Sequence, residues 1–167
     1  ERGFWFLRVR SAFSAPPRRL LKLEVKAKGG RLRPAQATYQ TLCQEAGVAH
    51  IVGGVDHVIA LGVADPNRLG IGGWSYGGIL TDYTIATTPR FKAATSGAGS
   101  ALQLSMYGTD QYIYQYENEL GAPWKNQELW IKISYPFFHA DRITTPTLFL
   151  GGEKDFNVPL IGGEQMY

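Results

Sequence analysis

The spacing of apolar residues from position 48 onward predicts helices that alternate with short strands. Ile51, Val55, Val58 and Ile59 recur at helical spacing, and Gly62 lies where such a helix would end. A strand predicted over 68–73 runs directly into a turn of small residues. A second helix is predicted over 77–86, and the Thr-Thr-Pro sequence at 87–89 ends it.

The second half of the chain carries two further strand signals, over 91–95 and 146–150, and glycine follows each of them. Between them, 102–130 is rich in Tyr, Gln and Trp with weak periodicity. We expect this region to form helical and irregular cover over the edge of the sheet. The alternation of strands and helices predicts an α/β fold with a mostly parallel sheet and flanking helices.

Charge divides the chain near position 47. Residues 1–47 hold ten Lys and Arg against three Asp and Glu, a net charge of +7, whereas 48–167 hold seven against eleven, or −4. Period-two alternation over 21–28 predicts a half-exposed strand that ends at Gly29 and Gly30. Two other interpretations of the basic segment stay open: an arm that binds an anionic surface or nucleic acid, although it has no recognisable binding motif, and non-native sequence produced by a frame error.

Composition narrows the class of protein. The chain is 44% hydrophobic but has no apolar run of 18 residues, so we expect no membrane span. A single cysteine, Cys43, cannot form an internal disulfide and reads as a small buried or incidental residue. The chain opens on Glu1 and Arg2 without a signal peptide, which indicates a start other than the natural one and weakly favours the cytoplasm. Histidines and carboxylates show no ligand spacing, so we expect no metal and no cofactor.

One short segment carries nucleophile chemistry: Gly73-Trp74-Ser75-Tyr76-Gly77-Gly78. A G-x-S-x-G sequence between a strand and a helix is a nucleophile elbow, whose tight turn raises the serine oxygen above the sheet. Glycine is expected at 73 and 77 because a side chain there would collide with the neighbouring backbone. The Tyr76 N–H, at the start of the helix, is the expected first donor to an oxyanion. An idle serine in a glycine-rich turn is the alternative.

A carboxylate follows the last predicted strand. Asp155 lies in the loop after 146–150, at the carboxyl end of a strand, where open α/β sheets place their functional residues. Its predicted role is to accept the imidazole N–H of a Ser-His-Asp triad. Glu153 is the rival acid, and a solvated turn aspartate is the structural alternative.

The histidine of such a triad is expected after the acid in chain order. His50, His57 and His139 all precede Asp155, and none fits. We expect His57 on a helix surface and His139 in a structural contact. The sequence therefore predicts a partial site that is close to inactive, with the histidine encoded within a few tens of residues beyond Tyr167.

Four segments together resemble the prolyl oligopeptidase family, especially its acylaminoacyl-peptidase-like and dipeptidyl-peptidase-like bacterial members. They are 65–78, Arg90 to Ala94, His139 to Leu148, and Gly152 to Pro159. The resemblance covers about 48–167 and implies part of an α/β-hydrolase fold, with hydrolysis of short peptides through an acyl-enzyme at Ser75. It also implies a preceding β-propeller, a second oxyanion donor and a final helix, none of which we find in the sequence.

Other functions stay open at this point. The same scaffold and triad serve carboxylesterases and other acyl hydrolases. A noncatalytic module whose basic segment binds an acidic partner is a third possibility, to be tested by salt-sensitive binding that requires 1–47. Tyr76, Tyr83, Tyr107 and Tyr112 could line a pocket, although aromatic cover over the sheet is the favoured role.

Overall fold

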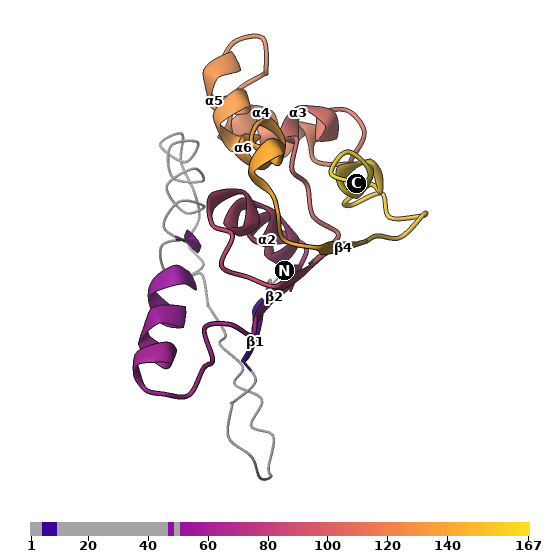
Figure 1. Cartoon of the computed structure of the whole chain (residues 1–167). Coiled ribbons are helices and arrows are strands. Elements are labelled where there is room, and N and C mark those ends of the chain that lie inside the picture. Colours follow the sequence, from indigo (N-terminus) through magenta and orange to yellow (C-terminus); the bar gives the residue numbers. More distant parts are fainter. Residues whose placement is uncertain (1–4, 10–46, 49–50) are drawn as a thin grey trace.

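The computed structural model describes residues 5–9, 47–48 and 51–167 (Figure 1). Of the basic segment 1–47, these ranges include only 5–9 and residue 47. The strand predicted over 21–28, Cys43 and His50 lie outside the described residues.

The centre of the fold is a four-stranded sheet in the order β1-β2-β3-β4 (Figure 1). Its strands are β1 (Trp5–Val9), β2 (Leu69–Trp74), β3 (Ala93–Gly97) and β4 (Thr147–Leu150). The last three run parallel, and β1 pairs antiparallel with β2. The predicted α/β fold with a mostly parallel sheet is therefore confirmed.

The strand predicted over 91–95 begins two residues later than expected, at Ala93. Phe91 is only 1% exposed and packs into the core just before the strand. The Phe91 carbonyl accepts a hydrogen bond from the Thr145 side chain, at 3.1 Å from Oγ1, and not from the backbone of a neighbouring strand. Apolar residues alone did not distinguish this anchor from the strand that follows it.

Two helices flank the strand β2, as predicted. Residues 51–60 are helical, and Gly62 ends this helix with φ of 68°. The Val63 N–H donates to Val58 O at 3.0 Å across that end, the bonding of a Schellman motif. The helix α2 (Tyr76–Thr87) begins immediately after the glycine-rich turn.

Both helices pack against the same face of the sheet. The main core consists of Ile51, Val55, Val58, Ala64, Leu69, Ile71, Ile85, Phe91 and Ala94. Leu69 and Ile71 alternate along β2 and so point to one face, and Ala94 pairs with Ile71 in the register. On the opposite face Trp74, Leu148 and Leu150 are 53, 58 and 44% exposed.

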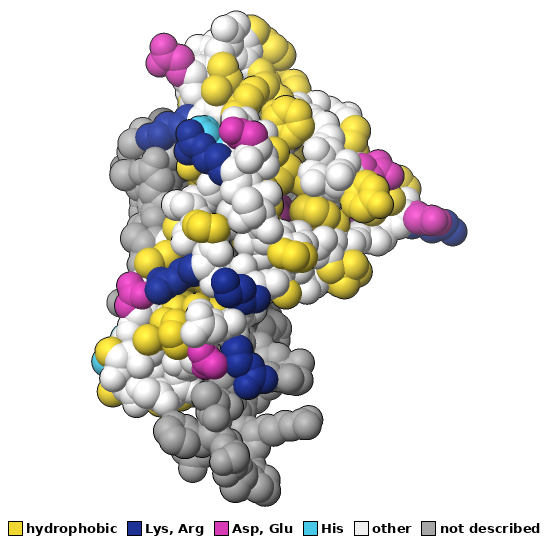
Figure 2. Space-filling view, viewed as in Figure 1, with side chains coloured by type: hydrophobic (Ala, Val, Ile, Leu, Met, Phe, Trp, Pro, Cys, Tyr) yellow, Lys and Arg dark blue, Asp and Glu magenta, His cyan; other side chains and the backbone are white. Residues whose placement is uncertain are grey.

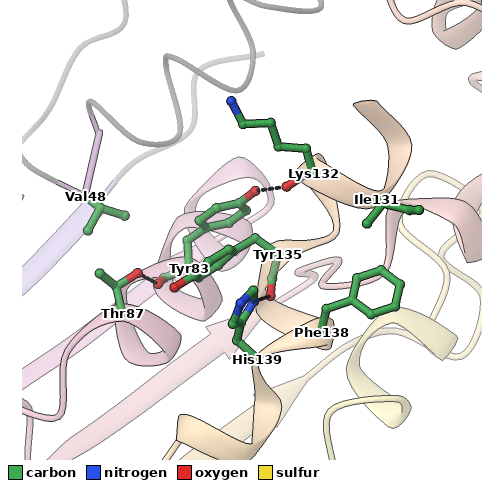
Figure 3. Close-up of a pocket in the computed structure, with 8 residues that line it drawn as sticks. All are labelled: Val48, Tyr83, Thr87, Ile131, Lys132, Tyr135, Phe138 and His139. Atoms are coloured by element: carbon green, nitrogen blue, oxygen red, sulfur yellow. Dashed lines mark hydrogen bonds between the residues drawn. The ribbon is translucent and has the colours of Figure 1, made fainter. Parts of the chain in front are cut away.

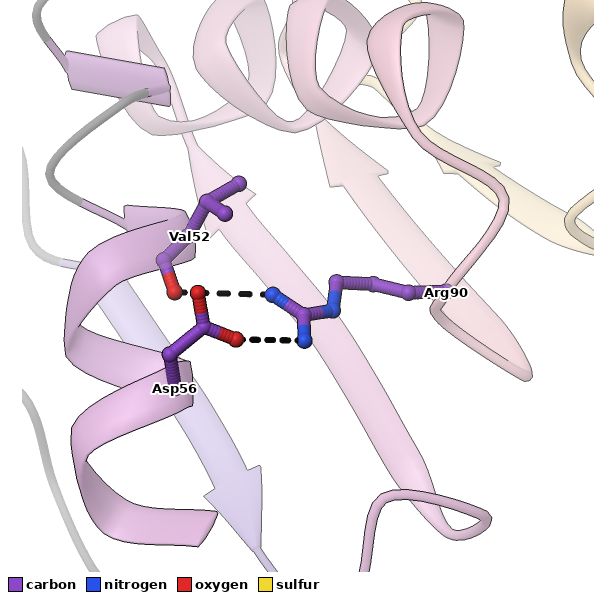
Figure 4. A network of polar contacts seen from close by, with 3 residues as sticks. All are labelled: Val52, Asp56 and Arg90. Atoms are coloured by element: carbon purple, nitrogen blue, oxygen red, sulfur yellow. Dashed lines mark hydrogen bonds and ion pairs between the residues drawn. The ribbon is translucent and has the colours of Figure 1, made fainter. Parts of the chain in front are cut away.

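An ion pair joins the helix 51–60 to the loop that follows α2. Arg90, just beyond α2, donates to Asp56 Oδ1 at 2.6 Å and to Val52 O at 3.5 Å (Figure 4). Arg90 is 26% exposed and Asp56 is 58% exposed, so solvent screens the pair.

The segment between β3 and β4, here called the cover, is helical and irregular as predicted (Figure 1). Its elements are α3 (Gln103–Met106), α4 (Ile113–Glu119), α5 (Gln127–Ile133), α6 (Tyr135–Phe138) and the short η1 (Ala140–Arg142), and α7 (Ile161–Glu164) follows β4. The main contacts of the cover outside the segment are with α2 and α7 rather than with the edge of the sheet. A second core forms around the fully buried Trp130, with Leu120 and Ile133. Tyr107 and Tyr116 meet the Trp130 ring edge-on, with centroids 5.5 and 5.7 Å away. No helix in the described part of the chain has the length and apolar character needed to span a membrane.

We expect the Arg90–Asp56 pair to contribute little to stability. Asp56→Asn should lower the free energy of unfolding by about 0.5 kcal/mol in low salt, and the loss should shrink as salt is added. Urea unfolding of the single and double variants with Arg90→Gln measures the coupling. The exposed Asp141→Asn is the matched control, and a coupling above about 2 kcal/mol would contradict this expectation.

Candidate active site

The turn at Ser75 has the geometry expected of a nucleophile elbow. Ser75 adopts φ of 59° and ψ of −125°, a conformation that costs a residue with a side chain about 1–3 kcal/mol. Backbone hydrogen bonds hold it there: the Ser75 N–H donates to Gly97 O at 2.8 Å, and Ser75 O accepts from the Gly78 N–H at 2.7 Å. The predicted sequence of strand, tight turn and helix is present.

Close backbone contact explains the glycine at 73. A Cβ on Gly73 would lie 2.2 Å from Gly77 O and 2.7 Å from Gly77 Cα, distances at which the helix would have to move. A Cβ on Gly78 would similarly lie 2.6 Å from Gly97 O of β3. The elbow therefore depends on main-chain atoms of β2, α2 and β3 packed without intervening side chains.

Ser75 occupies the N-cap position of α2 but makes no side-chain capping bond. A serine at this position ordinarily caps the helix through its hydroxyl. Here the positive φ directs the side chain away from that role, and the residue is half-buried. Tyr76 is the first residue of the helix, so its N–H lies where the positive end of the helix dipole acts.

The ends of the three parallel strands are level with one another. Trp74 pairs with Gly97, and Gly97 pairs with Leu150. Ser75 follows the first of these strands, and Asp155 lies in the loop after the last. Two strand spacings separate the strands, or about 10 Å. An acid that acts on a serine through an imidazole does not touch the serine, so this separation suits a triad.

The loop after β4 orients Asp155. Asp155 Oδ1 accepts hydrogen bonds from the N–H groups of Asn157 and Val158, both at 2.9 Å, and the residue is half-buried. Glu153 and Lys154 are exposed in this loop. Figure 2 shows an acidic and a basic side chain next to each other at the right-hand tip of the molecule. Of the two carboxylates considered from the sequence, Asp155 is the one fixed by its loop.

The cover also holds this loop, through a contact that the sequence did not reveal. Asn157 Oδ1 accepts from Tyr112 Oη and from Gln111 Nε2, each at 2.5 Å. The Tyr112 N–H in turn donates to Asp110 Oδ1 at 2.8 Å. The tyrosine-rich composition of 102–130 was visible, but no local pattern pairs residues 45 positions apart.

The described histidines lie away from Ser75. His57 is exposed on the helix 51–60. His139 stacks on Tyr135 with centroids 3.9 Å apart, and its Nδ1 lies 2.8 Å from Tyr135 O. It lines a pocket of about 400 Å³ together with Thr87 (Figure 3). Thr87 is twelve residues beyond Ser75 along the helix, or about 18 Å.

The four tyrosines considered as pocket residues have separate positions. Tyr83 does line the pocket with His139, and its hydroxyl donates to Lys132 O at 2.9 Å (Figure 3). Tyr107 belongs to the second core, Tyr112 binds Asn157, and Tyr76 adjoins the nucleophile position. Within the described ranges, no cluster of three or more His, Cys, Asp or Glu could hold a metal ion.

A buried carboxyl lies beneath the elbow and was missed from the sequence. Asp82, on α2, is 1% exposed, and burial raises its pKa to about 7 despite a smaller opposing effect of a hydrogen bond with Ser96. A lone aspartate within a helix usually faces solvent. The available signal was its position seven residues after Ser75, which places it on the same face of the helix.

Comparison with known proteins supports the resemblance seen in the sequence. A family model described as the prolyl oligopeptidase family matches residues 36–167. An acylamino-acid-releasing enzyme from Arabidopsis thaliana is 36% identical over 120 residues, which cover 66% of this chain and 16% of that protein. The uncharacterized peptidase YuxL from Bacillus subtilis is 33% identical over 108 residues, with 62 and 16% covered.

Solved structures agree. The chain is similar to an acylaminoacyl peptidase from Pyrococcus horikoshii, with a TM-score of 0.69 and 27% identity over 76% of this chain and 21% of that one. It is also similar to a puromycin-hydrolyzing peptidase from Mycobacterium tuberculosis, with a TM-score of 0.64, 31% identity, and 71 and 18% covered. The chain thus spans about a fifth or less of the length of these proteins.

Replacing Gly73 should destabilise the fold. We expect Gly73→Ala to cost about 3 kcal/mol because the new methyl group overlaps the backbone of Gly77. Gly53→Ala is the matched control: it lies in the helix 51–60 with open space around the added Cβ and should stabilise by about 0.5–1 kcal/mol. Urea denaturation measures the free energy of unfolding of both variants. Equal effects of the two substitutions would show that the contact between Gly73 and Gly77 leaves room for a methyl group.

Asp82 should make stability depend on pH. Its folded pKa is about 7 against an ordinary value of 3.8, so its protonated form is favoured by folding and its ionised form opposes folding. The free energy of unfolding is therefore highest below pH 4, where Asp82 is protonated in both states. It falls by about 4 kcal/mol as the pH rises to 7. Asp82→Asn should therefore gain stability relative to wild type across this range, measured by urea unfolding from pH 4 to 8. The exposed Asp141→Asn should show no such gain.

Proposed function

This chain belongs to the prolyl oligopeptidase family of serine peptidases, and we propose that it supplies the nucleophile Ser75, the acid Asp155 and the oxyanion donor Tyr76 of a peptidase site. The observation that carries the proposal is the strained Ser75 turn at the same edge of the sheet as the Asp155 loop. A purely structural role does not explain Ser75, because it takes up a strained conformation and leaves its helix uncapped by its own side chain.

The proposed reaction is acyl transfer. Ser75 Oγ attacks the carbonyl carbon of a peptide bond while its proton passes to an imidazole, which then protonates the departing amine. Asp155 accepts the other imidazole N–H and stabilises the imidazolium. The two backbone N–H groups that bind Asp155 Oδ1 keep the carboxylate oriented for this role. Water then attacks the acyl-enzyme and restores Ser75.

The Tyr76 N–H would stabilise the negative charge that develops on the carbonyl oxygen. It lies at the first position of α2, where the helix dipole adds to its own bond dipole. Loss of one such donor typically costs about 3–4 kcal/mol of transition-state stabilisation.

The imidazole is proposed to come from a histidine that follows Asp155 in chain order and is not among these 167 residues. His57 and His139 are poor candidates, because the first is exposed on the helix 51–60 and the second shares a pocket with the far end of α2. As substrates we propose short peptides. One similar structure is an acylaminoacyl peptidase in complex with Z-Gly-Gly-Phe-chloromethyl ketone, and another is described as a puromycin-hydrolyzing peptidase.

Labelling with a fluorophosphonate tests the nucleophile. We expect slow modification of Ser75 in the 167-residue chain, and modification at least about 100-fold faster in a polypeptide extended along the same gene to include a following histidine. Ser75→Ala should abolish the label, which peptide mass spectrometry locates. Asp155→Asn should slow the labelling of the extended protein.

Ser105→Ala is the matched control, since Ser105 is also half-buried but donates its hydroxyl to Leu102 O at 2.7 Å. This control should label like wild type. Strong labelling that survives Ser75→Ala would overturn the assignment.

A further inference from the structure

We propose that Asp82 is a positioning residue for Ser75: its buried carboxyl, acting through the Ser96 hydroxyl, locks the first turn of α2 onto the loop 97–100 when protonated and releases it when ionised. The inference deepens the proposed function, on which its catalytic meaning rests. The lock itself is a property of the fold that can be measured separately.

Asp82, Ser96 and Gly99 meet at one point beneath the elbow. A Cβ built on Gly99 would lie 2.8 Å from Asp82 Oδ2 and 2.6 Å from Ser96 Oγ. Ser96 lies on β3 on the same face as Ala94, the face that α2 covers. The carboxyl therefore reaches from the helix to the strand and the loop at once.

The loop 97–100 ties together both strand ends that carry the proposed catalytic residues. Gly97 O accepts from the Ser75 N–H at 2.8 Å, and the next residue, Ala98, donates its N–H to Leu150 O at 2.7 Å. Ala98 is held at φ of 45°, the second described non-glycine residue with positive φ after Ser75. A group that fixes this loop fixes the position of the nucleophile relative to the strand that leads to Asp155.

The carboxyl is incompletely bonded as the structure stands. Among the described residues, Asp82 Oδ1 has no hydrogen-bond partner, and the buried Ser100 Oγ, in the loop 97–100, has none either. A buried carboxylate with an unpaired oxygen is costly, whereas a protonated carboxyl has one donor to place and less charge to solvate.

The Ser96 hydroxyl explains how protonation couples to the elbow. It has a single hydrogen, which it donates to Gly78 O at 3.3 Å in the first turn of α2. Protonated Asp82 can donate to the Ser96 oxygen and leave that bond intact. Ionised Asp82 has no hydrogen to give and competes for the Ser96 hydrogen. This competition removes the side-chain bond from β3 to Gly78, three residues from Ser75.

Among the described residues, no charged group contributes to holding Asp82 in either form. The elements packed against α2 carry titratable groups at Tyr135, His139, Asp141 and Arg142, and the helix 51–60, which shares the main core with α2, carries Asp56 and His57. None of these groups is a cause of the raised pKa of Asp82. Burial and the Ser96 hydroxyl alone act on it. Its titration is therefore set by the elbow itself.

Amide hydrogen exchange of the 167-residue chain at pH 6 and pH 8 tests the lock, with rates corrected for the intrinsic effect of pH. We expect protection of the Ser75 and Ala98 N–H groups to fall by about tenfold between these values. We expect the Ser75 and Ala98 N–H groups to exchange through local opening, faster than global unfolding allows. The Lys92 and Ala94 N–H groups, bonded at the opposite end of β3 to Leu69 O and Pro146 O, should lose no more protection than the fall in global stability accounts for.

Variants of Asp82 and Ser96 test whether protonation of Asp82 controls the protection of the Ser75 N–H. Asp82→Asn, whose amide can donate to Ser96 at any pH, should keep Ser75 protected at both values. Asp82→Ala should lose protection at both. Ser96→Ala provides a second route should Asp82 variants fold poorly: it should leave Ser75 weakly protected already at pH 6.

An unchanged pH dependence in Asp82→Asn overturns the inference. So does exchange of the Ser75 and Ala98 N–H groups at the slow rate set by global unfolding, because Asp82 would then act only through the pH dependence of global stability. If the exchange results hold while the fluorophosphonate never modifies Ser75, the lock stands and the proposed peptidase function fails.

Discussion

The contact between Gly73 and Gly77 is the constraint on which the site depends. The strand β2 and the helix α2 approach so closely there that the space for a Cβ at 73 is already occupied by Gly77 O. Because the chain must reverse direction within one residue, Ser75 takes up a positive φ. Its position, the start of the helix at Tyr76 and the contact of Gly78 with β3 all result from this approach.

Features governed by neighbouring residues were predictable from the sequence. The strand at 147–150, the helix that follows Ser75 and the helix end at Gly62 each have a local signal in glycine placement or apolar spacing. The catalytic roles of Ser75 and Asp155 remain predictions. Their placement at one edge of the sheet followed from the parallel order of the strands, in which all carboxyl ends meet.

Features that join distant residues were not predictable. The pairing of β1 with β2 links positions sixty or more residues apart. Phe91 looked like part of a strand, although it packs into the core before the strand begins. Nothing local marks Asp82 as buried or Asn157 as the partner of Tyr112. The contact of the cover with the Asp155 loop also joins distant residues. Tyr116 donates to Asp110 and packs on Trp130, so it connects the Tyr112–Asn157 contact to the second core. Burial and the bond to Asp110 raise the pKa of Tyr116.

The clamp formed by Gly97 and Ala98 uses only main-chain N–H and C=O groups. Every residue type except proline carries both groups, so the hydrogen bonds themselves do not select a side chain. Space selects it at Gly97, where a Cβ would lie 2.2 Å from Trp74 Cε3, and the positive φ disfavours bulky residues at Ala98. The clamp therefore restricts this end of β3 to small residues. Elsewhere most side chains can change, since the acylaminoacyl peptidase from Pyrococcus horikoshii keeps a similar backbone with only 27% of the residues identical.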